Sequence, residues 1–440
     1  MQFIVQAGGT LQGNIRVPGD KSISHRAIML GALAEGITEI NGFLDGDDCL
    51  ATLNAFRQMG VRIDELEKNK LRVYGVGLHG LKQPKDDLMM GNSGTSMRLM
   101  AGLMSGQAFD VCMTGDRSLS GRPMRRVTVP LAKMGAMIET DEGGTPPLTI
   151  RGGQNLQAIN YDLPIASAQV KSSVLLAGLY ANGKTCVTEP APTRDHSERM
   201  LRGFAYDVHT DGSQMCLKGR GRLKACHIDV PADISSAAFF MVAASIAPNS
   251  DLTLRHVGVN PTRTGVLDIL RLMGANIRLF NQKTIGGEPV ADIQIRSTLL
   301  KGIKIPEALV PLAIDEFPVL FIAAAFAQGK TILTGAEELR VKESDRIQVM
   351  ADGLRLCGVK AEPMPDGIVI QGGDFNGGQI ESHDDHRIAM AFSVAALCAK
   401  KTMVINHCST VDTSFPGFVK LARSVGFKIK AITKNKDISS

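Results

Sequence analysis

Cationic side chains stand where the sequence predicts the start of a helix, and this arrangement is suited to binding an oxyanion. In VPGDKSISHRA, a Pro-Gly turn precedes Lys21 and Ser22, and Arg26 follows one turn later on the same predicted face. A lysine point charge, a serine donor and an arginine fork together suit a phosphate or a carboxylate. The same segment also fits an ordinary capped helix with solvated charges, so both interpretations stay open.

Three further segments carry anion-binding candidates in the first half of the chain. Gly94 lies in GNSGTSMR, where small residues let backbone N–H groups approach an oxyanion. This is not a P-loop, because no Gly-Lys-Ser/Thr follows at the required spacing. Arg122, in SGRPM, stands beside a proline that restricts its backbone, and Arg194 opens the charged segment RDHSER. Each arginine also fits a surface position or a solvated helix cap.

Acidic candidates belong to the second half. In VKESDR, Lys342 and Arg346 share one face of a predicted helix at i, i+4 spacing, with Glu343 between them. A carboxylate beside two cations can donate or accept a proton at an anionic site. A surface helix with ion pairs is the alternative.

Charged residues also open two strongly apolar segments. Asp315 begins DEFPVLFIAAAFAQG, and His386 and Arg387 stand at the start of DHRIAMAFSVAALCAK. Charge at the start of a buried helix is costly unless it is paired or functional. A histidine beside aspartates could suggest a metal site or a hydrolase, but HExxH and GxSxG are both absent from the sequence.

A repeated pattern of elements positions these candidates. Six segments share a β-branched strand, a polar loop, an amphipathic helix, a glycine turn and a second strand, at intervals of roughly 70 residues. These segments begin at Thr38, Val111, Thr185, Leu252, Thr331 and Thr402. A nearly apolar helix precedes each one, and residues that cap helices are expected to open it. The expected openings are Ser22, Asn92, Ser167, Ser235, Asp315 and Asp385.

Length and composition limit the class of protein. A chain of 440 residues is too long for one ordinary core, so two or more domains are expected. A net charge of +5, no Trp and no Lys/Arg tract argue against a nucleic-acid partner. Residues 237–247 and 319–327 are too short to span a membrane and predict buried helices. We see no signal peptide, and we expect a cytoplasmic protein without a membrane partner.

The eight cysteines are scattered along the chain without a CxxC pair. This spacing argues against a zinc site and against a disulfide framework, and it fits a reducing compartment.

The order of the motifs is more specific than any one of them. Over nearly the whole chain, VPGDKSISHRA is followed by NSGTSMRL, SGRPM, SAQVKS, TRDHSERML, DISSAAFF, DEFP, RVKESDRI, DDHRIAMAF and TSFPGF. In these blocks the sequence resembles the EPSP synthase family, and SAQVKS and TRDHSERML resemble its bacterial class II branch. The resemblance implies an α/β fold: a two-domain inside-out α/β barrel with six βαβαββ-type repeats, three in each domain. It places residues 21–231 in one domain and residues 1–20 and 232–440 in the other, with the active site in the cleft between them.

The resemblance also implies the reaction. The enolpyruvyl group of phosphoenolpyruvate passes to the 5-hydroxyl of shikimate 3-phosphate through a tetrahedral ketal, with release of phosphate. The implied shikimate 3-phosphate ligands are Lys21, Ser22, Arg26, Ser167, Ala168, Gln169, Arg194, Asp315 and Lys342. The implied phosphoenolpyruvate ligands are Lys21, Gly94, Arg122, Gln169, Arg346 and Arg387. The implied catalytic residues are Asp315, Glu343, Lys21 and His386.

No metal or organic cofactor is implied, and we expect a monomer. We also expect inhibition by glyphosate, because Gly94 stands at the position where an alanine obstructs glyphosate in some members. Two positions depart from the family pattern: Ser414 stands where some members have Lys, and Glu338 where some have Asn. The alternatives are the related UDP-N-acetylglucosamine enolpyruvyl transferase, an RNA-end cyclase on a related fold and a non-catalytic anion-binding relative. The first needs a lid cysteine that DRSLSGRPM lacks. The second needs an RNA track and an adenylated histidine, and the third would not need both Asp315 and Glu343.

Overall fold

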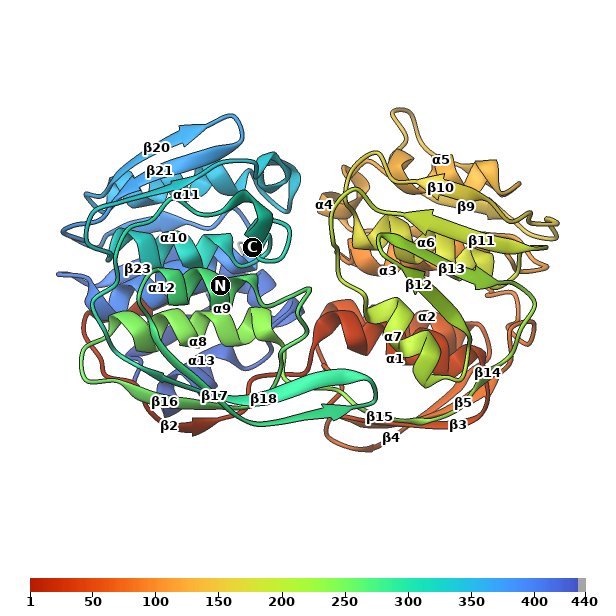
Figure 1. Ribbon diagram of the computed structural model, residues 1–440, viewed down its shortest axis with the longest axis horizontal. Helices are drawn as coiled ribbons and strands as arrows, with labels where there is room; N and C mark the ends of the chain where they lie inside the picture. Colours follow the sequence, from red (N-terminus) through yellow and green to blue (C-terminus); the bar gives the residue numbers. More distant parts are fainter. Residues whose placement is uncertain (434–440) are drawn as a thin grey trace, which may run out of the picture. The chain divides into compact units, whose positions relative to one another are not determined.

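The computed structural model describes residues 1–433, which divide into two compact units (Figure 1). The N-terminal unit consists of Gly19–Val230 and the short segment Thr284–Glu288. The C-terminal unit consists of Met1–Pro18, Pro231–Lys283 and the chain from Pro289 onward. Each unit has its own hydrophobic cluster of buried side chains, so each has its own core.

Three mixed sheets form within the described part of the N-terminal unit. The first contains β3 (Ala34–Asn41), β4 (Arg62–Glu67), β5 (Lys70–Val76), β14 (Leu223–Lys224) and β15 (His227–Asp229). The second contains β6 (Leu88–Met89), β7 (Val111–Thr114), β8 (Met137–Glu139) and β9 (Leu148–Arg151). The third contains β10 (Asn160–Asp162), β11 (Lys184–Thr188), β12 (Val208–Asp211) and β13 (Gln214–Lys218). In the first sheet β14 and β15 both pair with β3 in parallel, in each of the other two sheets one strand pair is parallel, and the remaining pairs of all three sheets are antiparallel.

The C-terminal unit also has three sheets among its described residues. One contains β1 (Gln2–Val5), β22 (Gln379–Glu381), β23 (Met403–Asn406) and β24 (Ile429–Ile432). Another contains β2 (Gln12–Ile15), β16 (Asp251–Gly258), β17 (Asn276–Ile285) and β18 (Glu288–Arg296). The last contains β19 (Lys330–Leu333), β20 (Lys360–Met364) and β21 (Gly367–Gln371).

Six helices are buried along most of their length because nearly all their side chains are apolar or small. They are α1 (Lys21–Leu33), α3 (Gly94–Met104), α6 (Ala168–Gly178), α8 (Ile234–Ile246), α10 (Phe317–Ala325) and α12 (His386–Ala395). Figure 1 shows α8, α10 and α12 side by side within the C-terminal unit, and these helices contact one another. The buried helices predicted at residues 237–247 and 319–327 are confirmed, because α8 and α10 occupy them.

The remaining helices are shorter or more exposed on one face. In the N-terminal unit they are α2 (Asp47–Gln58), α4 (Arg117–Ser120), α5 (Arg125–Lys133) and α7 (His196–Gly203). In the C-terminal unit they are α9 (Gly265–Leu272), α11 (Arg346–Leu356) and α13 (Phe418–Ser424). Four 3₁₀ turns are described in that unit: η1 (Glu307–Leu309), η2 (Glu337–Val341), η3 (Ala396–Cys398) and η4 (Cys408–Thr413). No helix within residues 1–433 is long and apolar enough to cross a membrane.

Several buried helices begin at residues other than those expected. Ser167 and Asp385 cap α6 and α12 as predicted. The caps of α1, α3 and α8 are instead Asp20, Ser93 and Asp233, each next to or near the expected residue. A cap is the residue whose side chain accepts from an N–H in the first turn, and adjacent polar residues compete for that place.

Asp315 is not the cap of α10. The helix begins at Phe317, with Glu316 at the N-cap position and without a side-chain cap hydrogen bond. Pro318 lies in its first turn, where a missing N–H is tolerated. Asp315 therefore belongs to the segment before the helix, and its carboxylate is available for other contacts.

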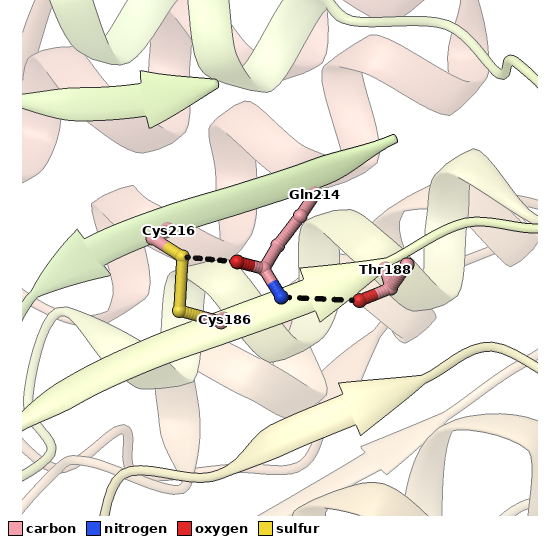
Figure 2. Close-up of a disulfide and its surroundings, with 4 residues drawn as sticks. All are labelled: Cys186, Thr188, Gln214 and Cys216. Atoms are coloured by element: carbon pink, nitrogen blue, oxygen red, sulfur yellow. Dashed lines mark hydrogen bonds between the residues drawn. A yellow bond between two sulfur atoms is a disulfide. The ribbon is translucent and has the colours of Figure 1, made fainter. Parts of the chain in front are cut away.

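One disulfide departs from the expectation drawn from cysteine spacing. Figure 2 shows Cys186 on β11 bonded to Cys216 on β13, two neighbouring strands of one sheet. The two residues are Cα partners in the antiparallel register, although 30 residues separate them in the chain. Beside them the Gln214 side chain donates to the Thr188 hydroxyl across the same strands. Strand register brings the cysteines together, and linear spacing does not reveal it.

Candidate active site

The first turn of α1 presents the cations that the sequence singled out. Asp20 caps the helix by accepting from the Ile23 backbone N–H at 2.8 Å, so Lys21 is the first helical residue. The Lys21 ammonium lies 3.1 Å from an oxygen of Asp48, at the start of α2. One turn later, Arg26 donates to the backbone carbonyl of Ser22 at 2.9 Å. Lys21, Ser22 and Arg26 thus lie together at one helix end, as predicted.

Arg26 is buried among hydroxyl groups. Its Nε donates to Ser197 Oγ on α7 at 2.7 Å, and its Nη2 donates to Ser172 Oγ on α6 at 2.9 Å. Burial lowers the pKa of Arg26 to about 10, against the opposing effect of the Glu198 carboxylate, and Arg194 is close enough to lower it further. A guanidinium held by neutral partners keeps its charge available for an anion.

The first turns of α3 and α6 are joined by side-chain hydrogen bonds. Arg98 donates to Gln169 Oε1 at 2.6 Å, and Gln169 Nε2 donates to Thr95 Oγ1 at 3.0 Å. Ser167 caps α6 by accepting from the Val170 N–H, which makes Ala168 and Gln169 the first helical residues. The three predicted ligands of the SAQVKS motif therefore stand at a helix N-terminus, where backbone N–H groups favour an anion.

Gly94 and Arg122 are neighbours although 28 positions separate them. A Cβ placed on Gly94 would lie 3.3 Å from Arg122 Nη1 and 3.2 Å from Arg98 Nη1. Arg122 also donates to Asn92 Oδ1 at 2.6 Å. The absence of a side chain at Gly94 thus lets two guanidinium groups approach the start of α3.

In the C-terminal unit, Asp315 is the meeting point of three cations. Its Oδ1 lies 3.6 Å from the Lys342 ammonium and 3.7 Å from Arg346 Nη1. Its backbone carbonyl accepts from Arg387 Nη1 at 2.9 Å. The structure therefore brings together four predicted residues, Asp315, Lys342, Arg346 and Arg387, from segments up to 72 positions apart.

Arg346 is held by two carboxylates and faces a third. Its Nε donates to Asp385 at 2.8 Å and its Nη2 to Glu343 at 2.6 Å. Burial would lower the pKa of Arg346, but Asp385, Glu343 and Asp315 outweigh it and raise this pKa. Among residues 1–433, the buried Nη1 of Arg346 has no hydrogen-bond partner. The guanidinium thus has two fixed edges and one edge suited to an incoming anion.

Asp385 is the buried counterpart of Arg346. Burial would raise the pKa of this carboxyl, but the Arg346 guanidinium outweighs it and holds the pKa below its ordinary value. Asp385 also caps α12 by accepting from the Arg387 N–H at 2.9 Å. It therefore orients Arg346 and fixes the helix turn that carries His386 and Arg387.

The expectation that Lys342 and Arg346 share a helix face is wrong. Asp345 caps α11 by accepting from the Gln348 N–H, so the helix begins at Arg346. Lys342 lies before it in extended backbone, after the turn η2. Both cations nevertheless lie near Asp315 Oδ1, the Lys342 ammonium at 3.6 Å and Arg346 Nη1 at 3.7 Å.

The two departures from the family pattern have different surroundings. Glu338 lies 2.7 Å from the Lys342 ammonium, so its carboxylate forms an ion pair with a predicted ligand. Ser414 follows η4 and is half-buried. His386 is the first residue of α12, buried, and close enough to Asp385 to lower the pKa of that carboxyl. In the described residues, no group of three or more His, Cys, Asp or Glu could hold a metal ion.

Sequence reasoning missed residues that position the predicted ones. Arg98 binds Gln169, Ser172 and Ser197 bind Arg26, and Asp385 binds Arg346. Arg98 and Asp385 belong to motifs that were singled out, NSGTSMRL and DDHRIAMAF, so those motifs were the available signal. Ser172 and Ser197 likewise belong to SAQVKS and TRDHSERML, but a small polar residue in a helix is common and does not by itself indicate a role.

These features define a class of protein. It is an α/β protein of two units, with cations gathered at the N-terminal ends of buried helices and with carboxylates among them in the C-terminal unit. Such sites bind small polyanions and can move protons on them.

Comparison with known proteins identifies the family. The family model described as EPSP synthase (3-phosphoshikimate 1-carboxyvinyltransferase) matches residues 5–421. The 3-phosphoshikimate 1-carboxyvinyltransferase of Alkalilimnicola ehrlichii is 66% identical over 427 residues, covering 97% of this chain and 96% of that relative. The enzyme of the same name from Methylococcus capsulatus is 64% identical over 428 residues, covering 97% of this chain and 98% of the relative. The chain belongs to the EPSP synthase family.

Solved structures agree with this assignment. EPSP synthase from Acinetobacter baumannii has a TM-score of 0.88 and 57% identity, covering 98% of this chain and 100% of that chain. The enolpyruvyl transferase NikO from Streptomyces tendae has a TM-score of 0.77 at 15% identity, covering 98% of both chains. The second likeness concerns the fold alone. The mixed α/β, two-domain fold of this chain is therefore that of EPSP synthase structures.

Proposed function

We propose that this chain transfers the enolpyruvyl group of phosphoenolpyruvate to the 5-hydroxyl of shikimate 3-phosphate, in the shikimate pathway. One observation carries the catalytic part of the proposal. Arg346 is fixed by Asp385 and Glu343, and its third edge faces Asp315 at 3.7 Å without a hydrogen-bond partner among the described residues. An anion bound to that edge would lie near two carboxylates that can exchange protons with it.

Residues of both units take part in the reaction. Shikimate 3-phosphate is bound by Lys21, Ser22, Arg26, Ser167, Ala168, Gln169, Arg194, Asp315 and Lys342. Phosphoenolpyruvate is bound by Lys21, Gly94, Arg122, Gln169, Arg346 and Arg387. Both substrates are polyanions that must react with each other, and cations in this number offset their repulsion.

The chemistry proceeds in two halves. Glu343 donates a proton to the methylene carbon of phosphoenolpyruvate while the 5-hydroxyl attacks the adjacent carbon and gives its proton to Asp315. In the second half phosphate leaves the tetrahedral ketal with the proton that Asp315 had accepted, and the methyl group returns a proton to Glu343, which restores the enol ether. Lys21 and His386 assist the proton transfers, and no metal or organic cofactor takes part.

The finer architecture follows the family. The six sheets belong to six copies of one βαβαββ-type unit, three in each domain, in an inside-out α/β barrel. The domains comprise residues 21–231, and residues 1–20 with 232–440. Support comes from the three sheets and three buried helices that each unit has within residues 1–433.

The protein acts as a cytoplasmic monomer, and glyphosate inhibits it competitively with phosphoenolpyruvate. The inhibitor part rests on Gly94, because a side chain there would meet the guanidinium of Arg122. Turnover measured at low phosphoenolpyruvate with millimolar glyphosate tests it, and an unchanged rate would contradict it.

The function is tested by following phosphate release from shikimate 3-phosphate and phosphoenolpyruvate. Release should require both substrates, and Glu343→Gln should lower kcat by about 10²- to 10⁴-fold, the usual contribution of a general acid. Glu362→Gln, on the exposed face of β20, is the matched control and should leave kcat unchanged. Binding of shikimate 3-phosphate without release would instead identify a non-catalytic anion-binding relative.

A further inference from the structure

Lys171 has an environment that the proposed chemistry does not use. It lies on α6 with only 1% of its side chain exposed, and its ammonium is 2.9 Å from Glu189 and 2.8 Å from Glu198. Both carboxylates are themselves almost completely buried. Removing three charges from water is costly unless their geometry serves a purpose, and α6 is otherwise apolar or small beyond its first turn.

Glu189 connects this ammonium to a predicted phosphate ligand. One of its carboxylate oxygens accepts from the Thr193 hydroxyl at 2.6 Å, and the other accepts from the Thr193 backbone N–H at 3.2 Å. Thr193 immediately precedes Arg194, so this double contact fixes the backbone from which Arg194 extends. The position of the Arg194 loop therefore depends on a carboxylate whose charge Lys171 balances.

Glu198 connects the same ammonium to a second predicted ligand. It stands on α7 directly after Ser197, whose hydroxyl accepts from Arg26 Nε at 2.7 Å. Ser197 also donates to Ser172 Oγ at 2.7 Å, and Ser172 accepts from Arg26 Nη2 at 2.9 Å. The Lys171–Glu198 contact thus holds α7 against α6 next to the two serine hydroxyls that accept hydrogen bonds from Arg26.

We infer that Lys171 is a positioning residue: it ties the Arg194 loop and α7 to α6 in the arrangement that binds the phosphate of shikimate 3-phosphate. The inference rests on the proposed function, because it assigns that phosphate to Arg26 and Arg194. Lys171 makes both connections with one ammonium, so no other side chain of α6 replaces it.

Lys171→Met tests the inference, since methionine keeps the length of the side chain and removes the charge. Steady-state kinetics should show a rise of about ten- to a hundredfold in the KM for shikimate 3-phosphate, the size expected when a binding group is misplaced. The KM for phosphoenolpyruvate and kcat should stay within about threefold of wild type, because most residues proposed to bind phosphoenolpyruvate or transfer protons do not contact Lys171, Glu189 or Glu198. Lys70→Met removes an exposed ion pair with Glu67 in the same unit and should change none of these values.

A second variant guards against a general loss of structure. Glu189→Gln keeps an acceptor for Thr193 but removes the charge. It should also raise the KM for shikimate 3-phosphate, by a smaller factor than Lys171→Met. Lys171→Arg keeps the charge and should restore most of the affinity. Calorimetric titration with shikimate 3-phosphate alone should reproduce the loss in Lys171→Met without any need for turnover.

The outcomes separate the inference from the proposed function. Wild-type turnover with an unchanged shikimate 3-phosphate KM in Lys171→Met would overturn the inference alone. Equal rises in both KM values, together with a lower melting temperature, would also overturn it, since they indicate a purely structural role. Absence of wild-type turnover would refute the proposed function, and the binding titration would still decide whether Lys171 positions the phosphate site.

Discussion

Replacing Asp385 by Asn tests whether this buried carboxylate supports Arg346. The Asp385 side chain has no exposed surface and makes four contacts. It accepts from Arg346 Nε at 2.8 Å and Nη2 at 3.3 Å, from Ser344 Oγ at 3.0 Å and from the Arg387 N–H at 2.9 Å. Asparagine keeps one oxygen for the helix cap but turns an N–H group toward the guanidinium.

The size of the effect follows from what remains around Arg346. Removing one partner of a buried ion pair costs about 3–5 kcal/mol, because the other charge stays buried. Glu343 at 2.6 Å and Asp315 at 3.7 Å still face the guanidinium, so we expect the lower end, about 3 kcal/mol. In a unit of roughly 220 residues, this corresponds to a melting temperature lower by about 6–12 °C.

Calorimetry and kinetics measure the two consequences of Asp385→Asn. The transition of the C-terminal unit should move down, and the KM for phosphoenolpyruvate should rise by about tenfold, because Arg346 is no longer held. The stability that the low pKa of Asp385 contributes is present above its ordinary pKa of 3.8 and is lost as the pH falls below it. The difference between variant and wild type should therefore close in acid.

Asp352→Asn is the matched control for this prediction. Asp352 also pairs with an arginine of α11, Arg355 at 3.3 Å, but both side chains are about half exposed. An exposed pair contributes about 0–1 kcal/mol, so the control should melt within about 4 °C of wild type. If Asp385→Asn behaved like Asp352→Asn in both assays, the argument that Asp385 supports Arg346 would be refuted.

Three other substitutions test the N-terminal unit. In Gly94→Ala, the new Cβ would meet Arg98 and Arg122 Nη1 at 3.2 and 3.3 Å, so steady-state kinetics should show the KM for phosphoenolpyruvate rising about two- to tenfold with little change in melting temperature. In Gly102→Ala, the Cβ would lie 2.1 Å from the Ser173 carbonyl oxygen, so urea unfolding should show a free energy of unfolding lower by about 3 kcal/mol. Gly121→Ala is the control, because its Cβ would meet only ordinary van der Waals contact and should leave the free energy of unfolding unchanged. Burial, and then the charges of Lys21 and Arg26, lower the pKa of His25 well below 6.5. The neutral imidazole therefore contributes its full stability above pH 6.5. As the pH falls further, the free energy of unfolding decreases by at most about 1.4 kcal/mol per pH unit. His25→Asn should flatten that slope in urea titrations, and the exposed His79→Asn should not.

The buried helices were the most predictable part of the fold. Residues 237–247 and 319–327 are long enough and apolar enough to be helices in any packing arrangement, and α8 and α10 confirm both. Helix starts were less predictable, because several polar residues precede each apolar run. At α1 the cap is Asp20 rather than Ser22, and only the hydrogen bond to Ile23 distinguishes them.

The candidate site was predictable in its residue types but not in its support. Lys21 stands at a helix start, as its motif indicated. The path of Lys342 was mispredicted, because i, i+4 spacing suggests a helix while Asp345 starts that helix three residues later. The link from Lys171 to Glu189 depends on how a strand and a loop return to α6, and local sequence does not encode that distance.

The two units hold their buried arginines in different ways. In the N-terminal unit, Arg26 is held by two serine hydroxyls and a carbonyl, so its charge is not cancelled by its direct partners. In the C-terminal unit, Arg346 is held by the carboxylates of Asp385 and Glu343. Neutral partners leave the whole charge of Arg26 for a phosphate, whereas the carboxylates beside Arg346 offset part of its charge and can carry protons next to the edge proposed to bind an anion. This difference supports the proposal that Arg26 binds the phosphate of shikimate 3-phosphate and that Glu343 and Asp315 exchange protons beside Arg346.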